Sequence, residues 1–169
     1  MIITKNTDTL IAALNKDDKH VFVHGSFNEV RKAIKEIKIE CLSMNRTKID
    51  FGWYMHLCHA TAFDSVIWVV DMDCGMFNDD NVHILKKMSA QKVIQHILTP
   101  EDYEFMNTST TIPSQETCNH FIKNGVMTIP LDGFKFVYVT KVSPRDFALG
   151  QSYWRSVRAL YDRSIFVQF

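Results

Sequence analysis

The run VIWVV at residues 66–70 restricts the fold of this chain more than any other feature of its sequence. A strand with one face in water alternates apolar and polar residues, whereas five consecutive apolar residues predict a strand that is buried on both faces. Strands of that kind belong to helix-covered parallel sheets, because parallel strands are joined by long crossover connections. The sequence therefore predicts a layered α/β domain.

Further segments supply helices and strands in alternation. From Asn28 onward, Val30 and Ile34 recur at helical spacing with charged residues between them, after a possible cap at Ser26. Strands are predicted at 20–24, 48–54, 91–98, 146–150 and 165–169, helices at 56–63, 81–90 and 152–162, and a long loop at 107–120, while 134–142 fits a strand or a helix. We conclude that the fold class is α/β, a Rossmann-like three-layer domain with a mainly parallel sheet.

Length and charge set further bounds. The chain has 169 residues, of which 46% are hydrophobic, and this is enough for a single domain with a buried core. Lysine plus arginine and aspartate plus glutamate both total 19, so no overall charge attracts nucleic acid or an anionic membrane. The four cysteines lack CxxC spacing, and the first residues lack the apolar stretch of a signal peptide. We expect a cytoplasmic protein with reduced thiols.

His56 and His59 lie three residues apart, directly after the predicted strand 48–54. A helical i, i+3 pair points both imidazoles to one side, where they can donate hydrogen bonds to phosphates at a strand-to-helix turn. Such donors suit nucleotidyl transfer, in which charge grows on the phosphates. Two other interpretations stay open, a metal site completed by Cys58 or a nearby carboxylate, and two ordinary structural side chains.

The order of several segments resembles a known family. KIDFGWYMHLCH is similar to a first strand followed by an HxGH turn, and SVIWVVDMDCGMF is similar to a second strand ending in VNPxQF. ILKKMSAQKVIQHILTPEDYEFM and VSPRDFALGQSYWRSVRAL follow in the same order. Together they resemble the N-terminal, nucleotide-binding half of pantothenate synthetase, a HIGH-motif nucleotidyltransferase. The resemblance implies one nucleotidyltransferase-like domain over 1–169, with residues 1–22 as an extension.

The resemblance also implies roles for particular residues. It makes His56 and His59 the catalytic pair and places Met55 at the nucleotide. The pantoate-binding positions of the family fall on Asp73 and Met76. For a nucleotide-binding protein on this fold, we expect the backbone at Gly150 and the helix start at Gln151 and Ser152 to receive an anion, and Arg155 or Arg158 to replace the charge of the family's lysine.

The departures from the family concern mostly substrate-binding groups. Cys58 replaces the glycine of HxGH, and the lysine and aspartate of the last motif fall on Ser152 and Tyr153. The lid domain that follows in the family has no counterpart within residues 1–169. Synthesis of pantothenate by the family mechanism is therefore not expected.

Three functions follow from these patterns. The first is a nucleotidyltransferase-like protein that binds ATP or a related nucleotide, with Mg²⁺, and that transfers an adenylyl group to a small acid if it is active. The second is a non-catalytic interaction protein that retains the fold and binds a protein partner or a second copy of itself. The third is a Mg²⁺-dependent enzyme that uses Asp71 and Asp73, since carboxylates at i and i+2 of an extended chain point the same way. None of the three involves nucleic acid or a membrane.

Overall fold

The computed structural model describes residues 5–16, 20–36, 41–44, 50–62, 66–74, 79–108, 115–148 and 152–169. Within them, the main sheet has five strands in the order β2-β3-β7-β1-β8, and every neighbouring pair is parallel. These strands are β1 (Val21–His24), β2 (Cys41–Met44), β3 (Val66–Asp71), β7 (Phe134–Thr140) and β8 (Ile165–Gln168). The VIWVV run forms β3 and is completely buried, as predicted.

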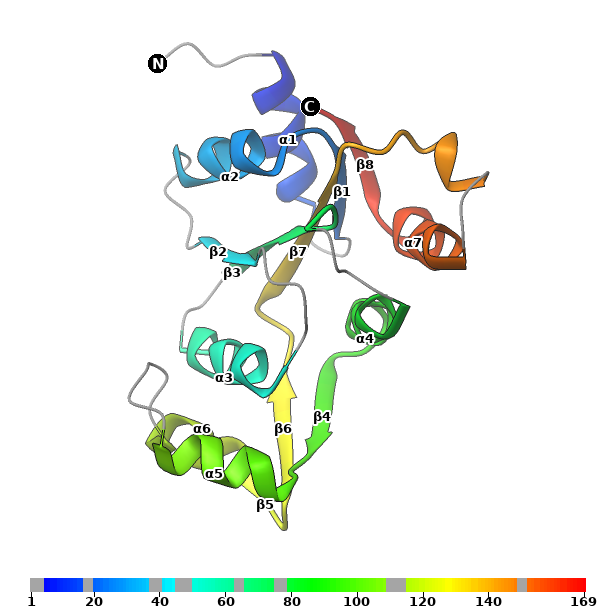
Figure 1. Ribbon diagram of the computed structural model, residues 1–169. Helices are drawn as coiled ribbons and strands as arrows, with labels where there is room; N and C mark the ends of the chain where they lie inside the picture. Colours follow the sequence, from blue (N-terminus) through cyan, green and yellow to red (C-terminus); the bar gives the residue numbers. More distant parts are fainter. Residues whose placement is uncertain are drawn as a thin grey trace.

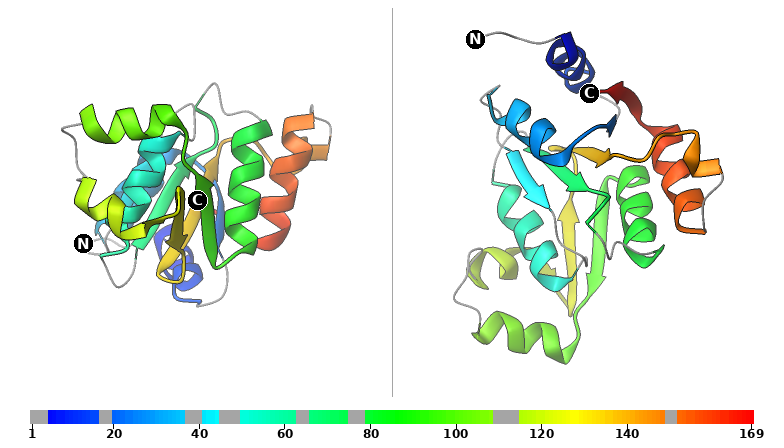
Figure 2. Two further views of the ribbon diagram at one scale, coloured as in Figure 1. Left: turned by 90° about the horizontal axis from the view of Figure 1, so that it is seen from below. Right: turned by 45° about the horizontal axis from the view of Figure 1, so that its top comes forward.

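Helices cover both faces of this sheet (Figures 1 and 2). Val21, Val23 and Val69 share one buried cluster with α1 (Lys5–Leu14) and α2 (Phe27–Glu36). The alternate residues Phe22 and Val70 share a second cluster with helices of the opposite face. Those helices are α3 (Phe51–Ala60), α4 (Asp79–Ala90) and α7 (Ser152–Arg163). The predicted α/β fold with three layers and a mainly parallel sheet is confirmed.

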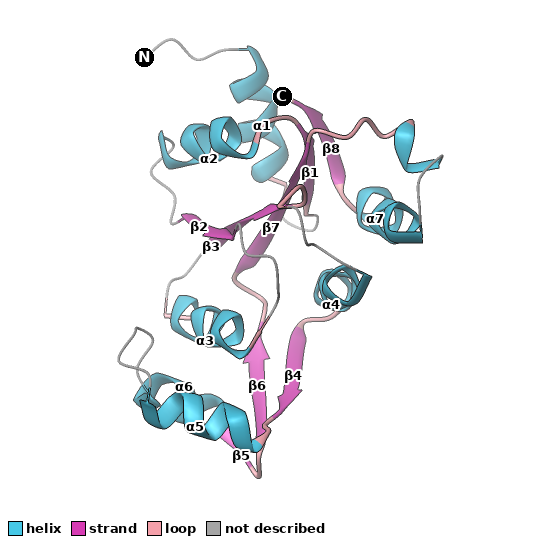
Figure 3. Ribbon diagram, viewed as in Figure 1, coloured by secondary structure: helices cyan, strands magenta, loops and turns pink. Residues whose placement is uncertain are grey.

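A small lobe is inserted between α4 and β7. It contains an antiparallel sheet of order β4-β6-β5, which lies below the parallel sheet in Figure 1 with α3 and α4 between the two. A two-residue turn at Asn124 and Gly125 joins β5 to β6, and both residues have positive φ, of 56° and 73°. The elements are β4 (Val93–Ile97), α5 (Pro100–Thr108), α6 (Gln115–Phe121), β5 (Ile122–Lys123) and β6 (Val126–Pro130). Figure 3 shows the strands of both sheets in magenta and the surrounding helices in cyan.

The predicted strand at 48–54 is wrong, because α3 begins at Phe51. The Asp50 side chain caps the helix by accepting the Trp53 N–H at 3.1 Å. This helix lies between the parallel sheet and the lobe, so it is buried on nearly all sides and lacks a polar stripe. A short apolar and aromatic run of this kind has the same appearance in a sequence as a buried strand.

Three more segments differ from or resolve the predictions. Residues 146–148 form a 3₁₀ helix instead of a strand, and α6 occupies part of the predicted loop at 107–120. The ambiguous segment 134–142 contains β7, the central strand of the main sheet.

Among the described residues, no helix has the length and apolar character needed to cross a membrane.

Candidate functional site

The carboxyl edge of the parallel sheet gathers polar groups from four separate chain segments. In an open α/β sheet, ligands bind outside the carboxyl ends of the strands, at the point where the connections diverge. Here β1 leads through α2 to β2 at one edge of the sheet, and β7 leads through α7 to β8 at the other. Because β1 and β7 are neighbours, the divergence lies between His24 and Thr140, the last residues of these strands.

Asp73 fastens the loop after β3 to the loop after β7. One carboxylate oxygen accepts the Thr140 hydroxyl at 2.6 Å, and the other accepts the Lys141 N–H, also at 2.6 Å. The Thr140 hydroxyl is completely buried and in turn accepts the Val142 N–H at 3.1 Å. Both oxygens of Asp73 are therefore engaged within the protein, and this carboxylate positions loops.

Asp71 ends β3 next to this pair. Its Oδ1 accepts the Asp73 N–H at 3.0 Å, so the chain turns after Asp71 and does not extend through 71–73 as predicted. Burial raises the pKa of Asp71 above its ordinary value, and the Lys141 ammonium opposes that rise in pKa. A half-buried carboxylate with a lysine nearby thus stands at the carboxyl edge.

His24 bridges the two strands on either side of β1. Its Nδ1 lies 2.9 Å from Gln168 Oε1 and its Nε2 lies 3.0 Å from the Lys141 carbonyl oxygen. The next residue, Gly25, is packed so closely that a Cβ there would lie 3.1 Å from Phe169 Cβ. The turn from β1 to α2 is therefore short and tightly held, and α2 begins at Phe27 directly beside it.

The predicted catalytic histidines lie elsewhere. α3 lies on the lobe side of the parallel sheet, away from the carboxyl ends of its strands (Figure 1), and His56 is in the middle of this helix and His59 in its last turn. Both are partly exposed, while Met55 is buried in the core. The expectation that the histidines occupy a strand-to-helix turn is wrong, because α3 starts five residues before His56.

The other predicted residues are spread over several places. Ser152 begins α7, and Arg155 is exposed in the first turn of the same helix. Gly150, Gln151 and Met76 lie outside the described residues. In the part of the chain that the structure describes, no group of three or more potential metal ligands is found.

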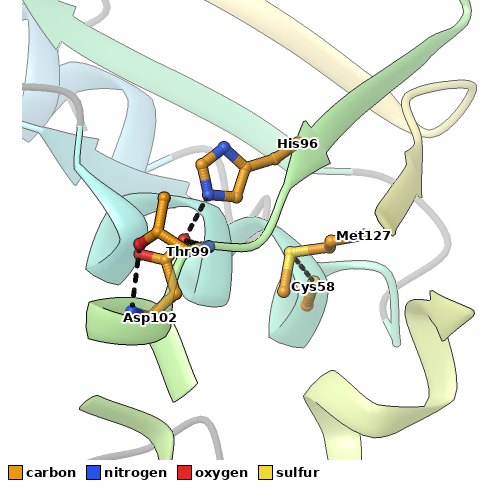
Figure 4. Close-up of polar contacts among 5 residues, drawn as sticks. All are labelled: Cys58, His96, Thr99, Asp102 and Met127. Carbon is orange, nitrogen blue, oxygen red and sulfur yellow. Dashed lines mark hydrogen bonds and ion pairs between the residues drawn. The ribbon is translucent and has the colours of Figure 1, made fainter. Parts of the chain in front are cut away.

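The lobe contains a His–Asp pair that the sequence analysis did not single out (Figure 4). His96 Nε2 lies 2.8 Å from Asp102 Oδ2, which also accepts the Thr99 N–H at 2.9 Å. The Asp102 N–H donates back to the Thr99 hydroxyl at 3.3 Å, so Thr99 and Asp102 cap α5 reciprocally. The His96 ring stacks on Tyr54 with 4.8 Å between the ring centroids. The spacing of Thr99 and Asp102 just before a helix was the available sequence signal, and the pair anchors α5 to β4.

Cys58 is an inert thiol. It is completely buried and donates to Met127 Sδ at 3.7 Å (Figure 4). A hydrogen bond with the Cys118 thiol, together with burial, holds the pKa of Cys58 far above its ordinary value. The thiolate needed for nucleophilic or metal chemistry is therefore disfavoured.

Comparison of the sequence with protein-family models and with curated proteins finds no match.

Proposed function

We propose that this domain binds a nucleotide at the carboxyl edge of the parallel sheet, between the ends of β1 and β7. The observation that carries the proposal is the divergence of the connections at these two neighbouring strands, which is the usual ligand position in open α/β sheets. This keeps the nucleotide expected from the sequence but moves its site away from His56 and His59.

The groups at this edge suit a phosphate chain. The start of α2 supplies backbone N–H groups and the positive end of a helix dipole within two residues of β1. The exposed Lys141 adds a positive charge beside Asp71. Phosphates can thus be bound by the N–H groups at the start of α2, which follows β1, and by the ammonium group of Lys141, which follows the neighbouring strand β7.

Asp71 suits the Mg²⁺ that accompanies a nucleotide. Magnesium is commonly held by one or two protein carboxylates, with phosphate oxygens and water completing its shell, so a cage of protein ligands is not required. Asp71 uses Oδ1 to accept the Asp73 N–H, and Asp73 uses both oxygens to hold the β7 loop. Asp71 would therefore bind the ion, and Asp73 would position the loops around it. No catalytic step is proposed for this site.

A second candidate function is supported by the distribution of exposed apolar side chains. Among the described residues, the large hydrophobic side chains that are exposed lie between Val93 and Phe105, with Phe166 as the exception. Exposed apolar side chains that gather in one region indicate a protein interaction site. This favours an interaction protein that binds through its lobe, and the two functions are compatible because they use different surfaces.

The nucleotide proposal is tested by thermal unfolding with ATP, CTP or ADP, each with and without Mg²⁺. A ligand at a hundredfold excess over its dissociation constant adds about 2.7 kcal/mol, which raises the midpoint by several degrees in a domain of this size. Asp71→Asn should remove the Mg²⁺-dependent part of the shift, and Lys141→Met should reduce the whole shift.

The matched control is His59→Ala, which should leave the shift intact because α3 is not part of the proposed site. A shift lost in His59→Ala and kept in Asp71→Asn would return the site to the histidines. Absence of a shift with every nucleotide would refute nucleotide binding and leave the interaction protein.

A further inference from the structure

The lobe presents an open strand edge at β4. β4 is at the end of the order β4-β6-β5, and in the described part of the chain it pairs with β6 alone. The Leu131 N–H donates to the Lys92 carbonyl at 2.8 Å, and the Leu98 N–H donates to the Gly125 carbonyl at 2.9 Å. These two bonds lie at opposite ends of the same ladder, so they fix which residues of β4 bond to β6.

The hydrogen-bond pattern of an antiparallel ladder determines in which direction the N–H and C=O groups of the other β4 residues point. Residues that exchange hydrogen bonds with a neighbouring strand alternate with residues whose N–H and C=O groups point the other way. Lys92 and Leu98 bond toward β6, hence Ile94 and His96 do so as well. Val93, Gln95 and Ile97 therefore direct their N–H and C=O groups away from β6, to the open edge.

The side chains of these three residues are exposed too. Ile97 is 76% exposed and Val93 is 39% exposed, and Gln95 lies between them on the same face. Native proteins usually protect such edges with charges, prolines or bulges, because an open apolar edge pairs readily with another strand. Val93, Gln95 and Ile97 include none of these protective features.

We propose that a second copy of this chain pairs with β4 as an antiparallel strand, about a two-fold axis at Gln95. In that register Gln95 lies opposite Gln95 of the partner subunit, and Val93 lies opposite Ile97 of the partner subunit. It is the register in which all three outward residues of each copy exchange both hydrogen bonds with outward residues of the other copy. The two small sheets become one continuous sheet.

The charges near the ends of β4 fit this antiparallel arrangement. The exposed Lys87 and Lys92 lie before the strand, and the exposed Glu101 and Glu104 lie after it. A two-fold axis at Gln95 brings the basic end of each copy to the acidic end of the other. Opposite charges across an interface steer association and fix its register.

A pocket beside the edge provides room for a partner side chain. It has a volume of about 500 Å³ and is lined in part by Tyr54, Ile84, Lys87 and residues 93–95. In the proposed pair, Ile97 of the partner subunit is opposite Val93, which lines this pocket. A closed two-fold contact of this kind explains why the most exposed large apolar side chain among the described residues lies on the edge strand β4.

The test is the oligomeric state of the full chain, measured by sedimentation velocity over a wide concentration range without nucleotide. The wild type should sediment as a dimer at high concentration, and association should weaken as salt rises. Ile97→Lys should raise the dimer dissociation constant about tenfold or more, because it places a charge against the partner's apolar residue. Gln95→Pro removes an N–H that points to the open edge, without removing a hydrogen bond to β6, and should also weaken the dimer.

Two controls keep the result interpretable. Phe166→Lys changes an exposed apolar residue on β8, an edge strand of the parallel sheet, and should leave association unchanged. Circular dichroism and the unfolding midpoint show whether each variant folds. If Gln95→Pro does not fold, the result with Ile97→Lys decides the test. A monomer at all concentrations, or a dimer insensitive to Ile97→Lys, would overturn the proposal. Neither result bears on the nucleotide site.

Discussion

The carboxyl edge of the parallel sheet and the outer edge of the lobe handle their polar groups in opposite ways. At the carboxyl edge, Asp73, Thr140 and His24 hydrogen-bond to groups from neighbouring strands, so that the ends of β1, β3, β7 and β8 are held to one another. At the lobe, the outward backbone groups of β4 and the side chain of Ile97 face solvent. The comparison teaches that the carboxyl ends of the parallel strands bond to one another within one chain, whereas the outward backbone groups of β4 are placed to bond to another chain.

The largest expected effect contrasts the buried sheet with the exposed edge. Phe136→Ala should cost about 3–5 kcal/mol of unfolding free energy, because Phe136 is buried on the central strand and a cavity would remain. Ile97→Ala should change it by less than about 0.5 kcal/mol in the monomer, since little of its surface is buried. Urea unfolding at low protein concentration measures both changes in unfolding free energy. Equal changes would contradict the assignment of Phe136 to the core and of Ile97 to a surface that is open in the monomer.

A smaller effect concerns acid stability of the parallel sheet. His20 lies just before β1, and its Nδ1 accepts the Phe136 N–H at 3.1 Å. Burial, with a contribution from the Lys135 charge, lowers the pKa of His20 from 6.5 to about 4. The unfolded chain therefore binds a proton that the folded chain excludes, and stability falls as pH drops from about 6.5 toward 4.

The size of this loss is about 3 kcal/mol, the equivalent of the change in pKa from 6.5 to about 4. His20→Asn retains an acceptor for the Phe136 N–H but cannot titrate, so it should flatten this part of the stability curve. Unfolding free energies at pH 7 and pH 4.5 for both proteins provide the measurement. A variant that loses stability as steeply as the wild type would assign the acid sensitivity to another group.

The smallest effect concerns the Asp73 contacts. Asp73→Asn places an amide N–H₂ where a carboxylate oxygen accepts, so either Thr140 or Lys141 loses its acceptor. We expect a cost of about 1–2 kcal/mol, typical of one broken hydrogen bond with a partly buried partner. Asp132→Asn, at an exposed position outside this cluster, is the matched control. Thermal unfolding detects the difference, and equal midpoints for the two variants would show that the loops hold without Asp73.

Local patterns predicted much of the fold. The continuous apolar run of β3 and the helical spacing of α2 each identified an element whose burial follows from sequence period alone. The strand expected at 48–54 failed because the cap at Asp50 and the placement of α3 between two sheets outweigh local preference. The hairpin of β5 and β6 had a visible signal in Asn124-Gly125, since an Asn-Gly pair suits a two-residue turn with positive φ.

The candidate site was harder to predict than the elements. The separation of Asp73 from Thr140 is 67 residues, and no spacing rule connects them, because their contact depends on the order of strands in the sheet. Asp71 and Asp73 were identified as a pair, but their different roles follow from the turn after β3 and from the neighbouring β7 loop. The order of strands, and with it the divergence between β1 and β7, cannot be read from periodicity.

The central position of β7 also shapes how the chain reaches this structure. Val66 of β3 pairs with Phe134, and Val21 of β1 pairs with Val137, so both earlier strands find their common neighbour only after the whole lobe has been synthesised. Closure of such distant contacts is slow, and buried strands that wait for a partner expose their apolar faces meanwhile. During synthesis on the ribosome, the parallel sheet therefore cannot assemble before β7 has been made, whereas the strands of the lobe are all available by then.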